Sequence, residues 1–208
     1  MKTTLLAPSV EQVHQDGEMW LDDSALSVEE ATYIACNGFG IGHSDSMKED
    51  VRHHLDTSTT YTIYEGLVKV GFVCYQLFGN ILYISGIVML PSAQGHGYAV
   101  KVTRLLAEKV GLPFLAYKTQ SPRMWSVGGK VCKNWYPNPN QNPNQEILGK
   151  IHVLCLCIGA IDFPVSKGFY GHALYTEKPV VKDQAVQAWW DEMCDFHAGD
   201  SVVCFGTM

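Results

Sequence analysis

The residues best suited to chemistry form the short segment Gln94-Gly95-His96-Gly97-Tyr98-Ala99, between an apolar run and an amphipathic one. Gly95 and Gly97 let the backbone turn tightly, so that several consecutive N–H groups can point into one concavity. Such a concavity at the start of a helix binds phosphate without needing basic side chains. The segment therefore predicts a backbone site for a pyrophosphate.

Two common phosphate-binding motifs fit this segment less well. The Walker motif needs Gly-Lys-Ser or Gly-Lys-Thr after four spacers, and the sequence has no such run. The dinucleotide fingerprint needs a third glycine where Val100 stands, and an acidic residue about 20 positions further on. Residues 118–120 read Lys-Thr-Gln instead. A glycine-lined pyrophosphate loop of another kind is the better interpretation.

The segment resembles the hallmark of the GCN5-related N-acetyltransferase (GNAT) superfamily, Gln/Arg-x-x-Gly-x-Gly/Ala, which residues 94–99 satisfy. An apolar strand and Pro91 precede it, and an amphipathic helix and a further strand follow. The resemblance covers roughly residues 25–132 and is loose beyond them. It implies a mixed α/β (α+β) fold with a GNAT-like central mixed β-sheet flanked by helices and a C-terminal helical insertion or extension.

The resemblance also implies a cofactor and a reaction. Acetyl-CoA would be the co-substrate, with no metal, and a primary amine would attack the thioester directly, so that proximity and a polarised carbonyl carry much of the rate. Backbone groups of Ile87, Val88 and Met89 would pair with the pantetheine arm and the acetyl carbonyl. The amides of residues 94–99 would hold the pyrophosphate. Ser121 stands near a position where the family often has an asparagine that contacts the cofactor arm.

Such a reaction needs a group that accepts a proton from the ammonium and one that supplies a proton to the thiolate. Glu65 is the first candidate base. It lies at the end of a strand next to the splayed pair, a position where family members often have an acidic residue that acts through a water molecule. His172 and Asp162 are further candidates for this role. The family's usual tyrosine acid is missing from residues 121–131, so Tyr136 and Tyr170 are considered as substitutes.

The missing tyrosine favours one alternative function, a catalytically silent CoA-binding or regulatory module on the same fold. A second alternative is an interaction protein whose glycine loop is only a turn. Three histidines are given no chemical role. His96 occupies a spacer position and is expected to face solvent, and His53 and His54 are neighbours on a helix that face different directions, which disfavours a metal site.

Capping signals and periodicity predict the elements that position these residues. Helices are expected over about 28–37, opened by a capping box at Ser27, and over 46–55, opened by a second box at Ser46, and also over 98–110, 121–131, 146–161 and 182–197. Strands are expected over 60–64, 69–78, 81–90, 113–119, 169–176 and 201–205, with a candidate edge strand at Thr3–Leu6. Residues 135–145 are a polar, proline-punctuated loop.

The length of 208 residues fits one acyltransferase domain over 1–208, with a loop–helix insertion at about 134–161. The 15 Lys and Arg against 21 Asp and Glu argue against a nucleic-acid partner. No apolar run reaches the roughly 18 residues of a membrane span. Seven cysteines without a Cys-x-x-Cys pair are typical of reduced core thiols, so a cytoplasmic protein is expected.

The acidic balance suits a cationic amine as the acceptor, either an amine-bearing small molecule or a protein lysine or N-terminus. The sequence leaves open which amine is acetylated, whether the acyl group is longer than acetyl, and whether the protein is a homodimer.

Overall fold

The computed structural model describes residues 18–208, so the candidate strand at Thr3–Leu6 lies outside the described part. Within residues 18–208, eight strands form one mixed sheet in the order β1-β2-β3-β4-β5-β8-β6, and β7 pairs with β8. Among these described strands, only β4 and β5 pair in parallel. The strands are β1 (Met19–Asp22), β2 (Thr59–Glu65), β3 (Val68–Phe78), β4 (Ile81–Met89), β5 (Phe114–Thr119), β6 (Asn134–Tyr136), β7 (Val165–Ser166) and β8 (Ser201–Thr207).

Six α-helices of the described chain flank the sheet. They are α1 (Val28–Phe39), α2 (Asp45–Thr57), α3 (Tyr98–Val110), α4 (Pro122–Val131), α5 (Gln145–Ile158) and α6 (Gln184–Met193), and a short 3-10 turn, η1 (Pro91–Ala93), precedes α3. The central mixed sheet flanked by helices confirms the expected fold class. No helix within residues 18–208 combines the length and the apolar character needed to cross a bilayer.

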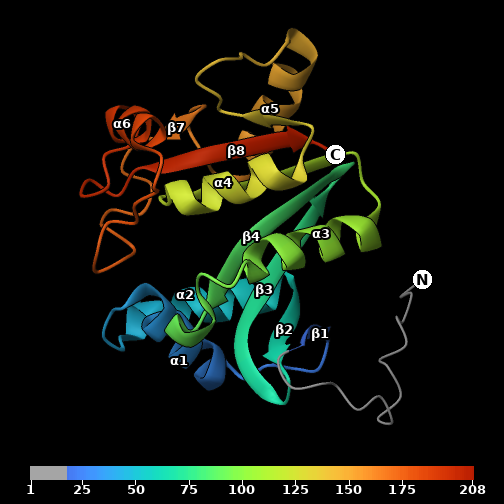
Figure 1. The fold of residues 1–208 in the computed structure, drawn as a ribbon, viewed down its shortest axis with the longest axis vertical. Coiled ribbons are helices and arrows are strands. Elements are labelled where there is room, and N and C mark those ends of the chain that lie inside the picture. Colours follow the sequence, from blue (N-terminus) through green and yellow to red (C-terminus); the bar gives the residue numbers. More distant parts are fainter. Residues whose placement is uncertain (1–17) are drawn as a thin grey trace.

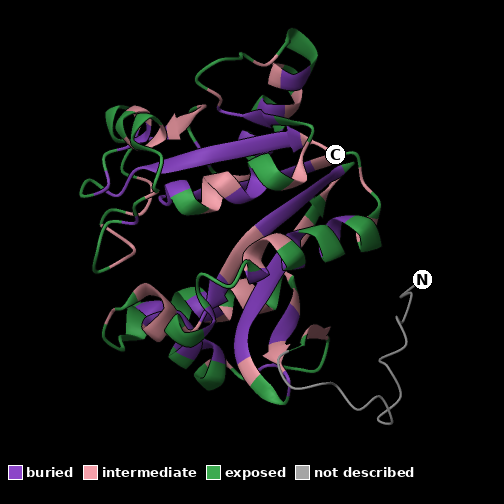
Figure 2. Cartoon of the chain, in the orientation of Figure 1, coloured by how far each residue is buried: buried purple, intermediate pink, exposed green. Residues whose placement is uncertain are grey.

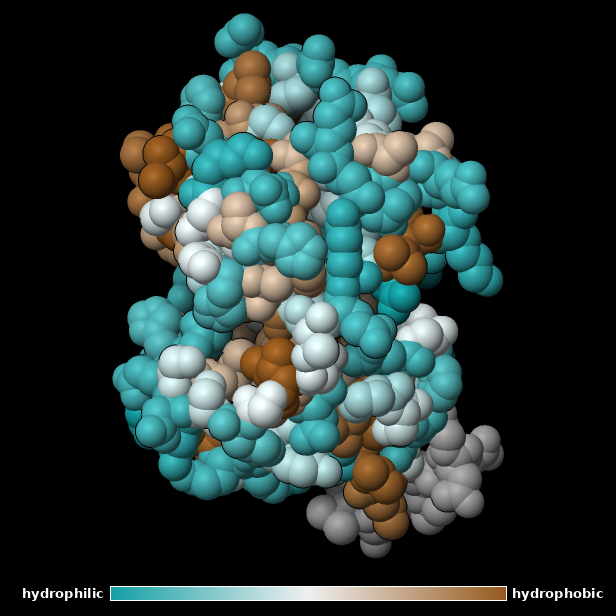
Figure 3. Space-filling view, turned by 90° about the vertical axis from the view of Figure 1, so that its left-hand side faces the viewer, coloured by the Kyte–Doolittle hydropathy of each residue, from teal (hydrophilic) through white to brown (hydrophobic). Residues whose placement is uncertain are grey.

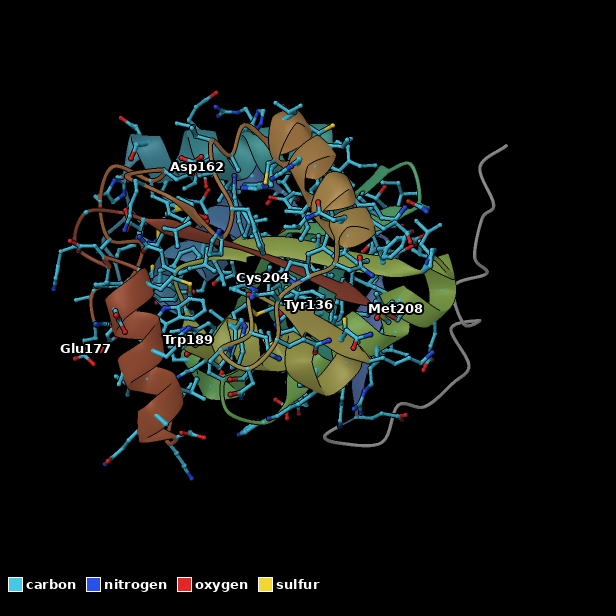
Figure 4. The ribbon with its side chains drawn as sticks, turned by 90° about the horizontal axis from the view of Figure 1, so that it is seen from above. Tyr136, Asp162, Glu177, Trp189, Cys204 and Met208 are labelled. Atoms are coloured by element: carbon cyan, nitrogen blue, oxygen red, sulfur yellow. The ribbon has the colours of Figure 1, made fainter. Side chains whose placement is uncertain are left out.

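The helices form two layers, one on each face of the sheet. Successive residues of a strand point to opposite faces, and in β3 Cys74 packs with α1 and α2 while Val73 packs in the core beneath α3. In β5, Ala116 packs with α5 and Leu115 with the layer of α3, α4 and α6. Figure 4 shows α5 and α2 on the same side of the sheet, opposite α4.

The molecule has two halves joined by the pairing of β4 with β5. Figure 1 shows β1–β3, α1 and α2 in the lower half, and β8 and α4–α6 in the upper half. Burial is highest along the strands at the centre, which Figure 2 shows for β3, β4 and β8, while the outer faces of the helices are exposed. All seven cysteines are free and five are buried, which confirms the expectation of core thiols.

Most expected elements are present, and five differ. The helix α2 begins after Ser44, whose side chain accepts a hydrogen bond from the Met47 amide, rather than at the capping box predicted at Ser46. The strand expected over 169–176 is an irregular loop, because its amides donate outside any ladder, as Thr176 does to Phe39 O. The short strands β1, β6 and β7 were not predicted, and β6 takes up the first residues of the loop expected over 135–145.

Candidate active site

The strands β4 and β5 separate halfway along their length. Their parallel pairing covers only Ile81–Ile84 of β4 and Phe114–Tyr117 of β5. The register against β3 then shifts and leaves Ser85 as a bulge residue, and β4 continues to Met89 without β5 as a partner. Backbone groups on this edge of β4 are therefore free to pair with something other than the sheet.

A cavity of about 370 Å³ lies where the two strands diverge. Ile84–Val88 of β4 and Tyr117–Thr119 of β5 form its walls, and residues of α1 and α2 and the loop over 169–175 complete it. That loop is tied across the two halves, because Leu174 N donates to Gln120 Oε1 at 2.8 Å and Phe39 packs edge-on against Tyr175 at 5.0 Å. Figure 3 shows an indentation between the two halves on this side of the molecule.

The segment over 94–99 presents unpaired backbone amides at the start of α3. Gln94 N donates to Pro91 O, but no hydrogen bond within the described chain engages the amides of residues 95–99. Gly95 and Gly97 have φ of +85° and +79°, and a Cβ atom at either would meet nothing within 4 Å. Of the amides predicted to line the concavity, that of Gln94 is therefore engaged by Pro91, and those of residues 95–99 have no partner among the described residues.

The start of α3 differs from the other helix starts of the described chain. The side chains of Ser27, Ser44, Ser121, Asn144 and Asp183 each cap a helix, whereas α3 begins at Gly97 with no side-chain cap. The first amides of a helix need partners, which a capping side chain or a ligand supplies. The positive end of the α3 dipole and these free amides together favour an anion.

Two side chains of the segment fix its position. Gln94 Nε2 donates to Gly38 O at 2.9 Å and to Met89 O at 3.0 Å, which holds the loop against α1 and the end of β4. Tyr98 is buried, and its hydroxyl donates a hydrogen bond to the carboxylate of Glu65. His96 is exposed, as expected. Among the other residues predicted to contact the cofactor, Ile87 and Val88 line the cavity, whereas Ser121 is buried and caps α4.

The structure places the candidate catalytic residues in different environments. Tyr170 and His172 line the cavity. Glu65 ends β2, bonded to Tyr98 and outside the residues that line the cavity. Tyr136 is buried in the core beneath α5, and Asp162 is exposed in the loop after α5. Figure 4 shows Tyr136 and Asp162 well apart.

Three ionisable residues that sequence reasoning did not select also line the cavity: Asp50 and His54 of α2, and Lys118 of β5. Their spacing carried a signal, because positions 50 and 54 are one helical turn apart and share a face. His54 Nε2 lies 3.9 Å from Asp50 Oδ2. The imidazole also lies against the bulged part of β4, since a Cβ atom at Gly86 would be 3.9 Å from Nδ1.

Burial controls the protonation of these groups. It lowers the pKa of His54, which the nearby Asp50 carboxylate partly opposes, so the imidazole is neutral at pH 7. It lowers the pKa of Lys118 to about 8, again against the effect of Asp50. Burial also raises the pKa of Tyr170 well above its ordinary value, so this hydroxyl remains protonated and can donate. The cavity thus holds a neutral base, a cation and a hydroxyl donor.

Comparisons with known proteins bear on the fold. No family model matches the sequence, and no curated protein is similar to it in sequence. The structure is similar to an IAA acetyltransferase from Bacillus cereus ATCC 14579, with a TM-score of 0.54 and 11% identity over 92% of this chain and 100% of that chain. It is also similar to a Bacillus subtilis acetyltransferase solved in complex with CoA, with a TM-score of 0.50 and 12% identity over 92% and 99% of the two chains.

These likenesses extend over nearly the whole of both solved chains. The chain therefore has the fold of the GCN5-related N-acetyltransferases.

Proposed function

We propose that the protein is an acetyl-CoA-dependent N-acetyltransferase that acts on the primary amine of a small molecule. The observation that carries this proposal is the set of free amides over residues 95–99 at the uncapped start of α3. A backbone site for a diphosphate beside a divergent strand pair suits CoA. The cavity beyond the strands then offers room for an acceptor.

The residues present fit CoA in two places. The amides of residues 95–99 would hold the pyrophosphate, and the free edge of β4 over 85–89 would pair with the amides of the pantetheine arm. Gly95 and Gly97 leave open space where a side chain would obstruct the diphosphate. When bound, acetyl-CoA supplies an acyl group activated as a thioester.

The chain's own residues would manage the protons. His54 is neutral at pH 7 and lies against the bulge of β4, so it would accept the proton from the attacking amine. Asp50 would act as a positioning residue that orients the imidazole. Tyr170, which stays protonated, would donate to the leaving group. Of the catalytic residues predicted from sequence, only Tyr170 keeps a direct role in this proposal.

The size of the cavity supports a small acceptor. A space of about 370 Å³ is near the lower limit of ligand pockets and suits a compact molecule better than a folded protein surface. The seven free thiols are in keeping with a reducing compartment, so we place the reaction in the cytoplasm.

Calorimetry and thiol release test the proposal together. We expect CoA to bind, and acetyl-CoA to release free thiol when mixed with a panel of small amines. Binding of CoA without thiol release for any amine would support the catalytically silent module instead. Absence of CoA binding would refute both functions.

Two matched substitutions separate the candidate bases. His54→Gln should reduce turnover by about 10²- to 10⁴-fold, the usual contribution of a general base, while CoA affinity stays within about twofold. Glu65→Gln should have a much smaller effect on turnover, because Glu65 lies outside the cavity lining. The reverse order of effects would restore Glu65 as the base.

A further inference from the structure

Lys118 is a cation that lines the cavity, and the Asp50 carboxylate of the same cavity lies beyond ion-pair distance from it. It follows Tyr117, the last residue of β5 that pairs with β4, so it lies on the β5 wall where the strands diverge. Its ammonium lies over the ring of Phe169, with Nζ 3.6 Å from the ring centroid. No carboxylate reaches it within ion-pair distance, and no hydrogen bond engages it, among residues 18–208.

Lys118 is partly buried, and proteins rarely keep such a charge without a close partner, because removing it from water is costly. The aromatic ring compensates only part of this cost. An ammonium in this state indicates that an anionic group occupies the cavity during function. That group is not the CoA diphosphate, since residues 94–99 are not part of the cavity lining.

The rest of the cavity defines the molecule that carries the anion. His54, the proposed proton acceptor, lies on the β4 side against Gly86, across the divergence from Lys118. An acceptor that bridges the two walls would place its amine toward His54 and its negative group toward Lys118. A single ammonium matches one negative charge, and the Asp50 carboxylate in the same cavity would attract the amine of such a molecule. Most of the remaining lining is apolar, with aromatic rings that include Phe39, Phe72, Tyr117, Phe169 and Tyr175.

We infer that the acceptor is a free amino acid with an apolar side chain, whose carboxylate pairs with Lys118. This inference rests on the proposed acetyltransferase function and narrows its substrate class. A simple cationic amine would leave Lys118 unpaired and would be repelled by it. An amino acid carries an amine for the reaction and a carboxylate that pairs with Lys118. Lys118 is therefore a residue that determines specificity.

Binding in the presence of CoA tests this inference without turnover, because free CoA carries no acyl group. Three pairs of probes differ only by a carboxylate: phenylalanine and phenethylamine, leucine and isoamylamine, and alanine and ethylamine. At least one amino acid should bind more tightly than its partner amine, by on the order of 10- to 100-fold for a charge-assisted contact.

Variants of Lys118 identify the contact. Lys118→Met removes the charge at similar length and should abolish the preference within each pair, while Lys118→Arg should retain most of it. Lys182→Met, an exposed lysine outside the cavity, is the matched control and should bind as the wild type does.

The failures of the inference and of the proposed function are distinguishable. Equal binding within every pair, tighter binding of the amines, or no binding of any probe overturns the amino-acid assignment. If CoA still binds and acetyl-CoA releases free thiol with other amines, the acetyltransferase proposal stands and only the amino-acid assignment fails. A preference that survives in Lys118→Met overturns the role of Lys118.

Discussion

Removing the Lys118 charge should make the protein more stable. Burial lowers the pKa of this amine from 10.5 to about 8, and at about 1.4 kcal/mol per pKa unit this displacement corresponds to about 3 kcal/mol of folding free energy at pH 7. Methionine has a similar length and needs no hydration. We therefore expect Lys118→Met to raise the free energy of unfolding by about 1–3 kcal/mol, the lower values reflecting residual contact with water.

The same lowering of the Lys118 pKa predicts that the stability of the protein depends on pH. Between pH 8 and 10.5 the unfolded chain holds a proton on Lys118 that the folded protein has lost, so the stability of the wild type rises with pH across this window. Below pH 8 the amine is charged in both states and the full penalty is present. The methionine variant lacks this rise, so its advantage is largest at pH 7 and shrinks toward pH 10.

Urea unfolding at pH 7, 8, 9 and 10 measures both effects for the wild type, Lys118→Met and the exposed control Lys182→Met. The control should follow the wild type within about 0.5 kcal/mol at each pH, as surface substitutions usually do. If Lys118→Met is no more stable than the wild type at pH 7, the ammonium is not held at a cost, and the reason for expecting an anionic ligand disappears.

Other substitutions test the rest of the site. Gly97→Val should weaken CoA binding in calorimetry by at least about tenfold, because the side chain obstructs the loop and is strained at φ +79°. The control Gly111→Val, at φ +66° on the far end of α3, should reduce the stability of the protein without reducing its affinity for CoA. Equal losses of CoA affinity in the two variants would contradict the loop assignment. Burial lowers the pKa of His54, so turnover should fall as the solution is made acidic enough to protonate its imidazole. A pH–rate profile with no fall on the acid side would exclude His54 as the base. Gly128→Ala should destabilise the fold by at least about 2 kcal/mol in urea unfolding, because its Cβ atom would lie 2.1 Å from the buried ring of Trp135; wild-type stability would mean that the ring can move.

The amino-acid sequence predicted the local features of the site well. The helix over 98–110 has the same bounds in the structure, and the glycine segment before it has the open, positive-φ backbone that its composition requires. Both features depend on residues adjacent in the chain, where periodicity and glycine content act directly. The strands that precede and follow this segment in the chain were predicted from the same local periodicity.

Side chains brought together from distant parts of the chain could not be predicted in this way. Glu65 was selected because it ends a strand, yet it bonds to Tyr98 instead of facing the cavity. The segment over 169–176 was predicted as a strand, but Tyr170 N donates to Gly199 O and Thr176 N to Phe39 O at the end of α1. In both cases the partner belongs to an element remote in sequence, and periodicity contains no information about it.

Sequence alone determined that the segment over 94–99 has an open, positive-φ backbone and which helix it opens, because backbone geometry is a local property. Only the tertiary structure decided which side chains line the cavity next to this segment. His54 and Lys118 are 64 positions apart and share a cavity because β4 and β5 diverge after Ile84 and Tyr117. Their protonation follows from burial in that space, which exists only when the two halves of the sheet are assembled.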